Sequence, residues 1–254
     1  MTVKIVTDLH SGTEALTREV GRDDVLLLLG DLVNIIDYVE MEGILVDVFG
    51  LDAVKEVVAL RAQKRFDEAR EVMARRREGR EEEIWTTLQT RLAEAYDEVK
   101  DSLPGHTYLI SGNIDPPAML ERLVGPNVEI IDGKVLELEG LSIGFVGGGL
   151  PTPLGIAGEI TEEEYASKLD GLGDVDVVCS HIPPDLPELT YDTLARRHER
   201  GSSHLLDYIR RVQPIRVFFG HIHQPLVSST HIGRTHLVNG GYFRRTGRAL
   251  ALWG

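Results

Sequence analysis

Short runs of apolar, mostly β-branched residues recur along the chain and predict buried strands. Between several of them lie amphipathic stretches with helix signals, notably 161–169 and 203–212, the second with Ser202 or Ser203 as its N-cap. Strand and helix therefore alternate, and this alternation predicts a largely parallel central sheet with helices on its faces. The predicted strands are 3–7, 25–29, 107–111, 141–146, 175–180 and 215–219.

Two further apolar runs, 128–131 and 134–138, are separated only by Asp132 and Gly133. An Asp-Gly pair between two such runs is typical of a tight hairpin turn. We therefore expect these runs to pair with each other, and we expect some antiparallel pairing at a sheet edge.

The segment 35–82 departs from this rhythm, because it lacks strand signals and is rich in Glu, Arg and Ala. A helical stripe is formed there by Val54, Val58, Phe66, Ala69 and Met73. The charged run 75–83 that follows indicates a solvated helix face or tip. A second stripe leads into the strand at 107 and comprises Ile84, Leu88, Leu92, Tyr96 and Val99. We expect one domain over residues 1–254 with a helical insertion at about 35–82, acting either as a lid or as a self-association surface.

Composition narrows the class of protein further. The chain has 254 residues and a single cysteine, Cys179, so it builds neither a disulfide framework nor a Cys-rich zinc site. No run approaches the roughly 20 apolar residues of a membrane-spanning helix, and the chain begins with a strand-like run rather than a signal peptide, so we expect a cytoplasmic protein. A net charge of −14 disfavours nucleic acid as a partner. A small phosphate ester remains a fitting partner if metal cations supply the positive charge.

Polar residues cluster at the ends of the predicted strands. Because the carboxyl ends of parallel strands meet at one edge of a sheet, these side chains can converge. Asp8 and His10 are separated by one residue, as are His221 and His223, so in extended backbone each pair points to one side and could hold one ion. The predicted metal ligands are Asp8, His10, Asp31, Asn113, His181, His221 and His223.

The chemistry of this set favours a borderline divalent metal. Imidazoles, carboxylates and an amide oxygen suit Mn, Fe, Zn, Ni or Co better than calcium. Glycines at 30, 112 and 220 permit the tight turns that aim the following ligands. Taken alone, Asp31 is as well explained by a helix cap and Asn113 by a turn. The ordered combination is what argues for a metal site.

The series D-L-H, G-D, G-N-x-D, S-H and G-H-x-H resembles the five-block signature of the calcineurin-like metallophosphoesterases, and in particular small prokaryotic phosphoesterases. The resemblance covers Asp8 to Asn239. It implies an α/β sandwich of two mixed sheets flanked by helices, and two divalent metal ions bridged by Asp31. One ion would be held by Asp8, His10, Asp31 and His223; the other by Asp31, Asn113, His181 and His221.

The resemblance also implies an activity: hydrolysis of a phosphomonoester or phosphodiester by a hydroxide that the two metals share. Asp31, Asn113 and His181 are the residues we expect to be catalytic. The alternative is a binding or scaffold module on this fold, as in a retromer subunit, with a weak or vestigial site. A nuclease is disfavoured by the acidic balance.

One position departs from the family pattern. Many members carry a histidine between the Asn and Asp of the third block, thought to protonate the leaving oxygen or to orient the phosphate, whereas this chain has Ile114. Asp115, which normally orients that histidine, is then either a turn former, which we favour, or a substitute acid. His198 is a distant candidate acid or an ordinary solvated histidine. The glycines at 147–149 could approach a phosphate, but such turns are common after strands.

Overall fold

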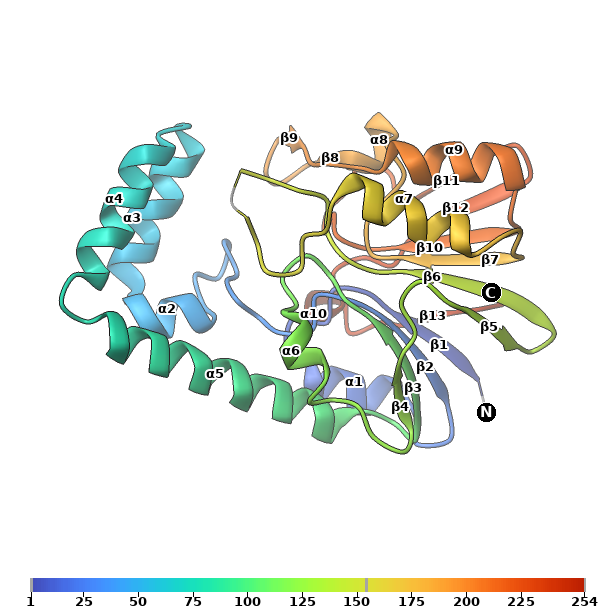
Figure 1. The fold of residues 1–254 in the computed structure, drawn as a ribbon, viewed down its shortest axis with the longest axis horizontal. Helices are drawn as coiled ribbons and strands as arrows, with labels where there is room; N and C mark the ends of the chain where they lie inside the picture. Colours follow the sequence, from blue (N-terminus) through green and yellow to red (C-terminus); the bar gives the residue numbers. More distant parts are fainter. Residues whose placement is uncertain (1, 154, 254) are drawn as a thin grey trace.

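Two large β-sheets packed face to face form the body of the computed structural model, which describes residues 2–153 and 155–253 (Figure 1). In the first sheet, four parallel strands are flanked by one antiparallel edge strand. Its order is β13 (Leu250–Ala251), β1 (Val3–Val6), β2 (Val25–Leu29), β3 (His106–Ile110) and β4 (Val128–Ile130).

The second sheet has a parallel centre and two antiparallel edges. Its order is β11 (Ser229–Ile232), β12 (Thr235–Asn239), β10 (Arg216–Phe219), β7 (Val177–Ser180), β6 (Leu141–Val146) and β5 (Val135–Leu138). A small ribbon, β8 (Tyr191–Asp192) and β9 (Arg197–His198), lies apart from both sheets. The predicted sandwich of two mixed sheets is confirmed.

The strand β2 shows why these runs are apolar throughout. Val25, Leu27 and Leu29 face the core between the two sheets. Leu26 and Leu28 belong to the core on the opposite side of the first sheet. A strand covered on both faces has no solvated side, so a continuous apolar run replaces the alternating pattern.

Helices cover the outer faces of the sandwich. Against the first sheet lie α1 (Thr13–Glu19), α5 (Glu81–Ser102) and the short α6 (Pro117–Leu120). Against the second sheet lie α7 (Glu162–Gly171) and α9 (Ser203–Val212). Ser202 is the N-cap of α9 and accepts a hydrogen bond from the Leu205 amide. Two further short helices are α8 (Pro187–Thr190) and α10 (Phe243–Thr246). Among the described residues, no helix combines the length and the apolar character needed to cross a membrane.

The predicted hairpin between 128–131 and 134–138 is wrong. β4 pairs with β3 in the first sheet, whereas β5 pairs with β6 in the second, so the chain crosses from one sheet to the other at Asp132 and Gly133. The carboxylate of Asp132 binds the Gly147 amide at 2.7 Å and the Lys168 Nζ at 2.8 Å. These long-range contacts replace the local turn. The expected antiparallel edge does exist, with β6 as the partner of β5.

Three helices occupy the segment in which the sequence predicts an insertion: α2 (Ile44–Phe49), α3 (Leu51–Ala62) and α4 (Phe66–Arg77). α3 and α4 pair as a hairpin that stands away from the two sheets, at the left of Figure 1. Its small core is made by Val57, Leu60, Ala69 and Val72.

The predicted stripe of this segment is only partly buried. Val54 and Ala69 are buried, but Phe66 is 46 % exposed, because it begins α4 rather than facing α3. In α3 the buried face runs through Val57 and Leu60 instead of Val58. The second stripe, on α5, packs as predicted: Ile84, Leu92, Tyr96 and Val99 are buried, and Leu88 packs against the same core.

Candidate metal centre

Seven polar side chains meet where five strands end. They follow β1, β2 and β3 of the first sheet and β7 and β10 of the second, so the site lies at the seam between the sheets. The structure brings together all seven residues that the sequence nominates: Asp8, His10, Asp31, Asn113, His181, His221 and His223.

The backbone at these residues is not extended, contrary to the geometry expected from the one-residue spacing. Asp8, His10, Asp31 and His221 have φ angles of 51°, 42°, 52° and 69°. Left-handed backbone is costly for such residues and persists where the surrounding structure enforces it, most often at functional sites. The side chains therefore converge because each strand ends in a sharp turn, not because neighbouring residues alternate along a strand.

The first group of potential ligands consists of Asp8, His10, Asp31 and His223, each offering one atom within 4.8 Å of the others. The Nε2 atoms of His10 and His223 lie 3.1 Å apart. The Nε2 of His10 lies 3.7 Å from Oδ2 of Asp31, and that of His223 lies 3.6 Å from Oδ1 of Asp8. Two ring nitrogens and two carboxylate oxygens thus face one small volume.

The second group shares Asp31 with the first and adds His181 and His221. The Nε2 of His181 lies 3.5 Å from Oδ1 of Asp31. The amide oxygen of Asn113 lies 3.1 Å from that Nε2 and 2.9 Å from the Nδ1 of His221. His221 and His223 therefore belong to different groups, and the expectation that this pair holds one ion is wrong. The short turn at His221 separates the two rings.

Hydrogen bonds and close packing prepare the ligand atoms. The Nδ1 of His181 donates to the Leu29 carbonyl at 2.9 Å, which orients the ring so that its Nε2 faces the second group. A Cβ atom at Gly112 would lie 2.0 Å from Oδ1 of Asp31, and one at Gly220 would lie 2.3 Å from Oδ2 of Asp8. Only glycine fits at these two positions, so the carboxylates are held by backbone packed directly against them. This mixed nitrogen and oxygen set, with Asp8, His10, Asp31 and His181 buried and the other ligands half-buried, fits divalent metal ions.

The two carboxylates sit in different electrostatic environments. Burial raises the pKa of Asp31, His181 opposes this rise, and the negative charges of Asp115 and Asp8 add to it, so the pKa reaches about 7. Burial also tends to raise the pKa of Asp8, but the hydrogen bond and charge of His223 outweigh it and lower the value to about 2. Asp31 thus carries an unfavourable negative charge at neutral pH that a cation would offset.

The four imidazoles differ from one another. Burial tends to lower the pKa of His181 and His223, but the charges of Asp31 and Asp8 outweigh it and raise the pKa of both rings. Burial lowers the pKa of His10 to about 3, with a further contribution from His223. Burial likewise lowers the pKa of His221 to about 3, assisted by the charge of His181. Neutral imidazoles are the form that binds metals, so these two rings are in the ligating state without first losing a proton.

Tyr242 and Arg244 contact the candidate ligands and are not among the residues predicted from the sequence. The Tyr242 ring stacks on His223 with 4.1 Å between centroids and 3° between planes, and its hydroxyl donates to Asp37 at 2.9 Å. Arg244 donates to the His10 carbonyl at 2.9 Å and pairs with Glu42. An aromatic residue directly after Gly240 and Gly241, just beyond the last motif, is the only sequence signal that marks them.

Ile114 and Asp115 have distinct roles in the structure. The Ile114 amide donates to Oδ1 of Asp31 at 3.2 Å, and its half-buried side chain carries no ionisable group. Asp115 is fully buried and accepts four hydrogen bonds, from the Asp31, Leu32 and Gly112 amides and from the Tyr96 hydroxyl. Asp115 therefore cross-links the loops at Asp31 and Gly112 through hydrogen bonds, and it is neither the simple turn former that we favoured from the sequence nor a free acid.

Two weaker candidates are accounted for by packing. The Nδ1 of His198 lies 3.3 Å from the Thr190 hydroxyl, and its ring meets Tyr191 edge to face. The amide of Gly148 donates to the Ser111 carbonyl, and a Cβ at Gly149 would lie 2.2 Å from Cβ of Asn113. The glycines at 147–149 thus allow close backbone packing behind Asn113.

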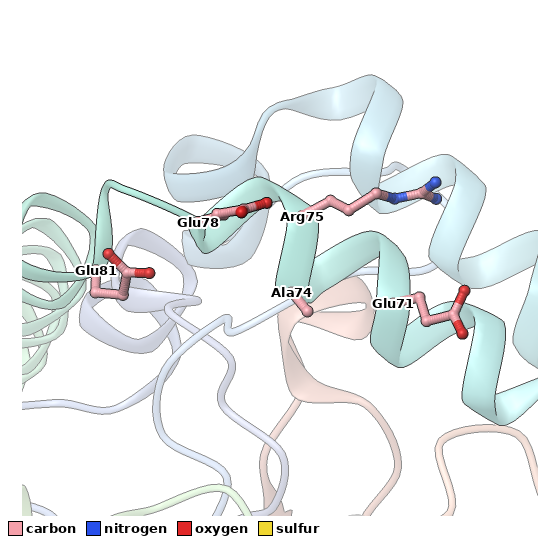
Figure 2. Close-up of a pocket in the computed structure, with 5 residues that line it drawn as sticks. All are labelled: Glu71, Ala74, Arg75, Glu78 and Glu81. Carbon is pink, nitrogen blue, oxygen red and sulfur yellow. The ribbon is translucent and has the colours of Figure 1, made fainter.

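A surface hollow of about 490 Å³ lies elsewhere, at the turn from α4 to α5. Figure 2 shows Glu71 and Glu81 at opposite ends of it, with Arg75 and Glu78 between them, so its ionisable groups do not converge on one point. This open, charged hollow agrees with the solvated helix tip expected from the sequence. The candidate chemistry lies at the strand ends instead.

The family model described as calcineurin-like phosphoesterase matches residues 1–225. The chain therefore belongs to the calcineurin-like phosphoesterase family, as the motifs indicate, and this membership points to a metal-binding hydrolase. No curated protein matches the chain significantly.

Among solved structures, the chain is similar to AQ665, a protein of unknown function from Aquifex aeolicus, at 12 % identity and a TM-score of 0.43, covering 98 % of this chain and 95 % of that one. It is also similar to a provisionally assigned 5'-nucleotidase from Staphylococcus aureus, solved in complex with alpha-ketoglutarate. That match has 10 % identity and a TM-score of 0.41, and covers 94 % of this chain and 48 % of that one.

Proposed function

We propose that the chain is a phosphoesterase that binds two divalent metal ions and hydrolyses a small phosphate ester. The observation that carries this proposal is the sharing of one carboxylate by two ligand groups. Oδ2 of Asp31 faces His10 at 3.7 Å, and Oδ1 of Asp31 faces His181 at 3.5 Å. A carboxylate with one oxygen facing each of two ligand groups is able to bridge a pair of metal ions.

The ligand set assigns the residues to two ions. Asp8, His10 and His223 would hold one ion with Asp31, while Asn113, His181 and His221 would hold the other with Asp31. Imidazole with carboxylate suits Mn, Fe, Zn, Ni or Co. When bound, such a pair of ions lowers the pKa of a coordinated water and offsets the negative charge of the phosphoryl group.

The chain's own side chains would contribute mainly by positioning the reacting groups. Asp31, Asn113 and His181 would place the phosphoryl group and the attacking water. Their donor atoms lie in or beside the second ligand group, and the Ile114 amide donates to Asp31 there. Ile114 provides no proton for the leaving oxygen. The proposed substrate is either a phosphomonoester or a phosphodiester whose leaving group departs without a proton from the protein.

A binding or scaffold module is the second candidate, and Ile114 is the observation that favours it. Metal-stripped protein reloaded separately with Mn, Fe, Zn, Ni and Co, then assayed with nitrophenyl phosphate and bis(nitrophenyl) phosphate, separates the two. We expect metal-dependent turnover of at least one ester and none in Asp31→Ala. If the wild-type protein binds both ions yet is no faster than Asp31→Ala, the phosphoesterase proposal fails and the binding module replaces it.

A further inference from the structure

Asp115 uses its whole carboxylate to hold two loops of the site. Oδ2 accepts from the amides of Asp31 and Gly112, both at 2.7 Å. Oδ1 accepts from the Leu32 amide at 3.0 Å and from the Tyr96 hydroxyl at 2.7 Å. A buried carboxylate needs such partners, because a buried charge without them is very costly. Here the three amide partners lie at the ends of β2 and β3, on Asp31 itself or beside a ligand residue.

These hydrogen bonds fix where the carboxylate of Asp31 lies. Asp31 has left-handed backbone, with φ at 52°, and therefore needs external support. Its amide is bound by Asp115, and its side chain accepts from the Ile114 amide at 3.2 Å. The two loops also touch closely, since Gly112 leaves no room for a Cβ against Asp31. Asp115 thus acts on the ligand through the backbone and does not itself face the ligand groups.

Tyr96 adds a partner from outside the loops. It lies on α5, is fully buried, and packs in the aliphatic core beneath the first sheet. Phenylalanine would fill the same space, so the hydroxyl is not needed for packing. A buried tyrosine hydroxyl requires a hydrogen-bond partner, and this one binds the carboxylate that supports Asp31. α5 is also the helix against which α2 packs.

We propose that Asp115 and Tyr96 are positioning residues that set the Asp31 carboxylate between the two metal sites. The proposal rests on the proposed function, because it assumes that Asp31 bridges two ions. In place of orienting a histidine, Asp115 aligns the bridge, and Tyr96 holds Asp115 in the orientation that accepts all four hydrogen bonds. Groups that orient metal ligands in this way typically change metal affinity about 10- to 100-fold when they are removed.

The test uses the full chain, stripped of metal and titrated with Mn²⁺ by calorimetry, with electron paramagnetic resonance of the loaded protein as a second measurement. Tyr96→Phe removes one hydrogen bond from Asp115 and keeps the packing. Asp115→Asn replaces one acceptor by a donor, which then faces donors. Tyr208→Phe is the matched control, because Tyr208 is a buried helical tyrosine whose hydroxyl donates to the Gly173 carbonyl at 2.6 Å, beneath the other sheet.

We expect Tyr96→Phe to weaken binding of the more loosely held ion about tenfold, and Asp115→Asn to weaken it further and abolish the spin coupling between the two ions. Tyr208→Phe should lower the melting temperature by about as much as Tyr96→Phe does, and it should leave Mn²⁺ binding unchanged. If Asp115→Asn fails to fold, Tyr96→Phe still decides. Wild-type affinity and spin coupling in Tyr96→Phe overturn the inference. A wild-type protein without spin-coupled Mn²⁺ overturns instead the two-metal proposal on which it rests.

Discussion

Ile114 can donate no proton to a leaving oxygen, and this lack should be visible in which esters the protein hydrolyses. General-acid catalysis typically contributes about a hundred- to ten-thousandfold. Nitrophenolate leaves without a proton, whereas an alkoxide does not. We expect turnover to depend steeply on the pKa of the leaving group, and we expect Ile114→His to flatten that dependence. The measurement is kcat/KM for a series of aryl and alkyl phosphoesters of graded leaving-group pKa.

His198 supplies the control for this prediction. Its ring contacts Tyr191 and Thr190 on the β8–β9 side, so His198→Ala should leave the series unchanged. A shallow dependence in the native protein that persists in His198→Ala would mean that another group donates the proton. An Ile114→His protein with an unchanged slope leaves the native steepness as the decisive result, because a pocket packed around isoleucine can hold imidazole in the wrong orientation.

Asp31 gives the metal-free protein a characteristic dependence on pH. Its pKa is raised from 3.8 to about 7, so between these values the folded state keeps a proton that the unfolded state has released. The Asp31 contribution to stability is therefore lost as pH rises through this window. In metal-free protein, Asp31→Asn should gain melting temperature relative to wild type as pH rises from about 4.5 to about 8. It should also lose the stabilisation by Mn²⁺ that wild type shows.

Asp37→Asn is the matched control for the pH prediction. Burial tends to raise the pKa of Asp37, but hydrogen bonds from the Glu40 and Val39 amides and from Tyr242 outweigh it and lower the value. Its contribution to stability is thus already complete above its ordinary pKa, and the Asp37→Asn difference should be constant over the same pH range. A constant Asp31→Asn difference would contradict the buried, uncompensated charge assigned to Asp31.

The sequence nominates the seven ligand candidates because each is a polar residue directly after an apolar strand run. It does not predict their left-handed backbone, since φ at His10 or His221 is set by packing from other strands. Nor does it predict the hydrogen bonds of Asp115, whose partners are backbone amides and a tyrosine 19 positions away. The stacking of Tyr242 on His223 is likewise not predicted, because it depends on tertiary structure.

At the scale of elements, the α3–α4 hairpin invites a direct test. Val57, Leu60, Ala69 and Val72 pack between its two helices, and the hairpin stands on the side toward which the strand ends point (Figure 1). We propose that it is a lid rather than a self-association surface. Replacing residues 51–78 by a short Gly-Ser linker should raise the activity on bulky esters relative to small ones and leave the solution mass per particle at that of one chain. Light scattering and paired assays measure both.

The same deletion also has a built-in control, because Mn²⁺ affinity should not change when α2, α5 and all seven candidate ligands remain. A wild-type dimer that becomes monomeric on deletion would favour self-association. Unchanged mass together with an unchanged ratio of bulky to small ester activity would rule out both roles.

Strands and helices with strong periodic patterns were predictable here, whereas pairing was not. The runs around β2, β7 and β10 are apolar because both faces are covered, and this is readable in sequence. The Asp-Gly pair at 132–133 predicts a hairpin that does not form, because β4 pairs with β3 in one sheet and β5 pairs with β6 in the other. In α3 and α4 the stripe indicated helices, but which residues face inward depends on how the two helices pack.

At the scale of the whole molecule, the candidate metal centre exists only because two sheets pack together. Asp8, His10, Asp31 and Asn113 follow strands of the first sheet, whereas the remaining three histidines follow β7 and β10 of the second. The interface between the sheets is apolar, and Phe145 and Phe218 are among its largest fully buried side chains. Metal binding and the packing of the two halves should therefore stabilise each other. No single motif contains this arrangement; the order of the motifs suggests it only through the family resemblance.

Metal content measured together with turnover decides whether Asp31 serves both metal sites. Wild-type protein loaded with Mn²⁺ and Asp31→Ala treated identically should be analysed for metal per chain and for hydrolysis of bis(nitrophenyl) phosphate. We expect two ions and turnover in the wild type, and loss of at least one ion together with loss of turnover in Asp31→Ala, because Asp31 contributes to both groups. Two tightly held ions with normal turnover in Asp31→Ala would contradict this expectation.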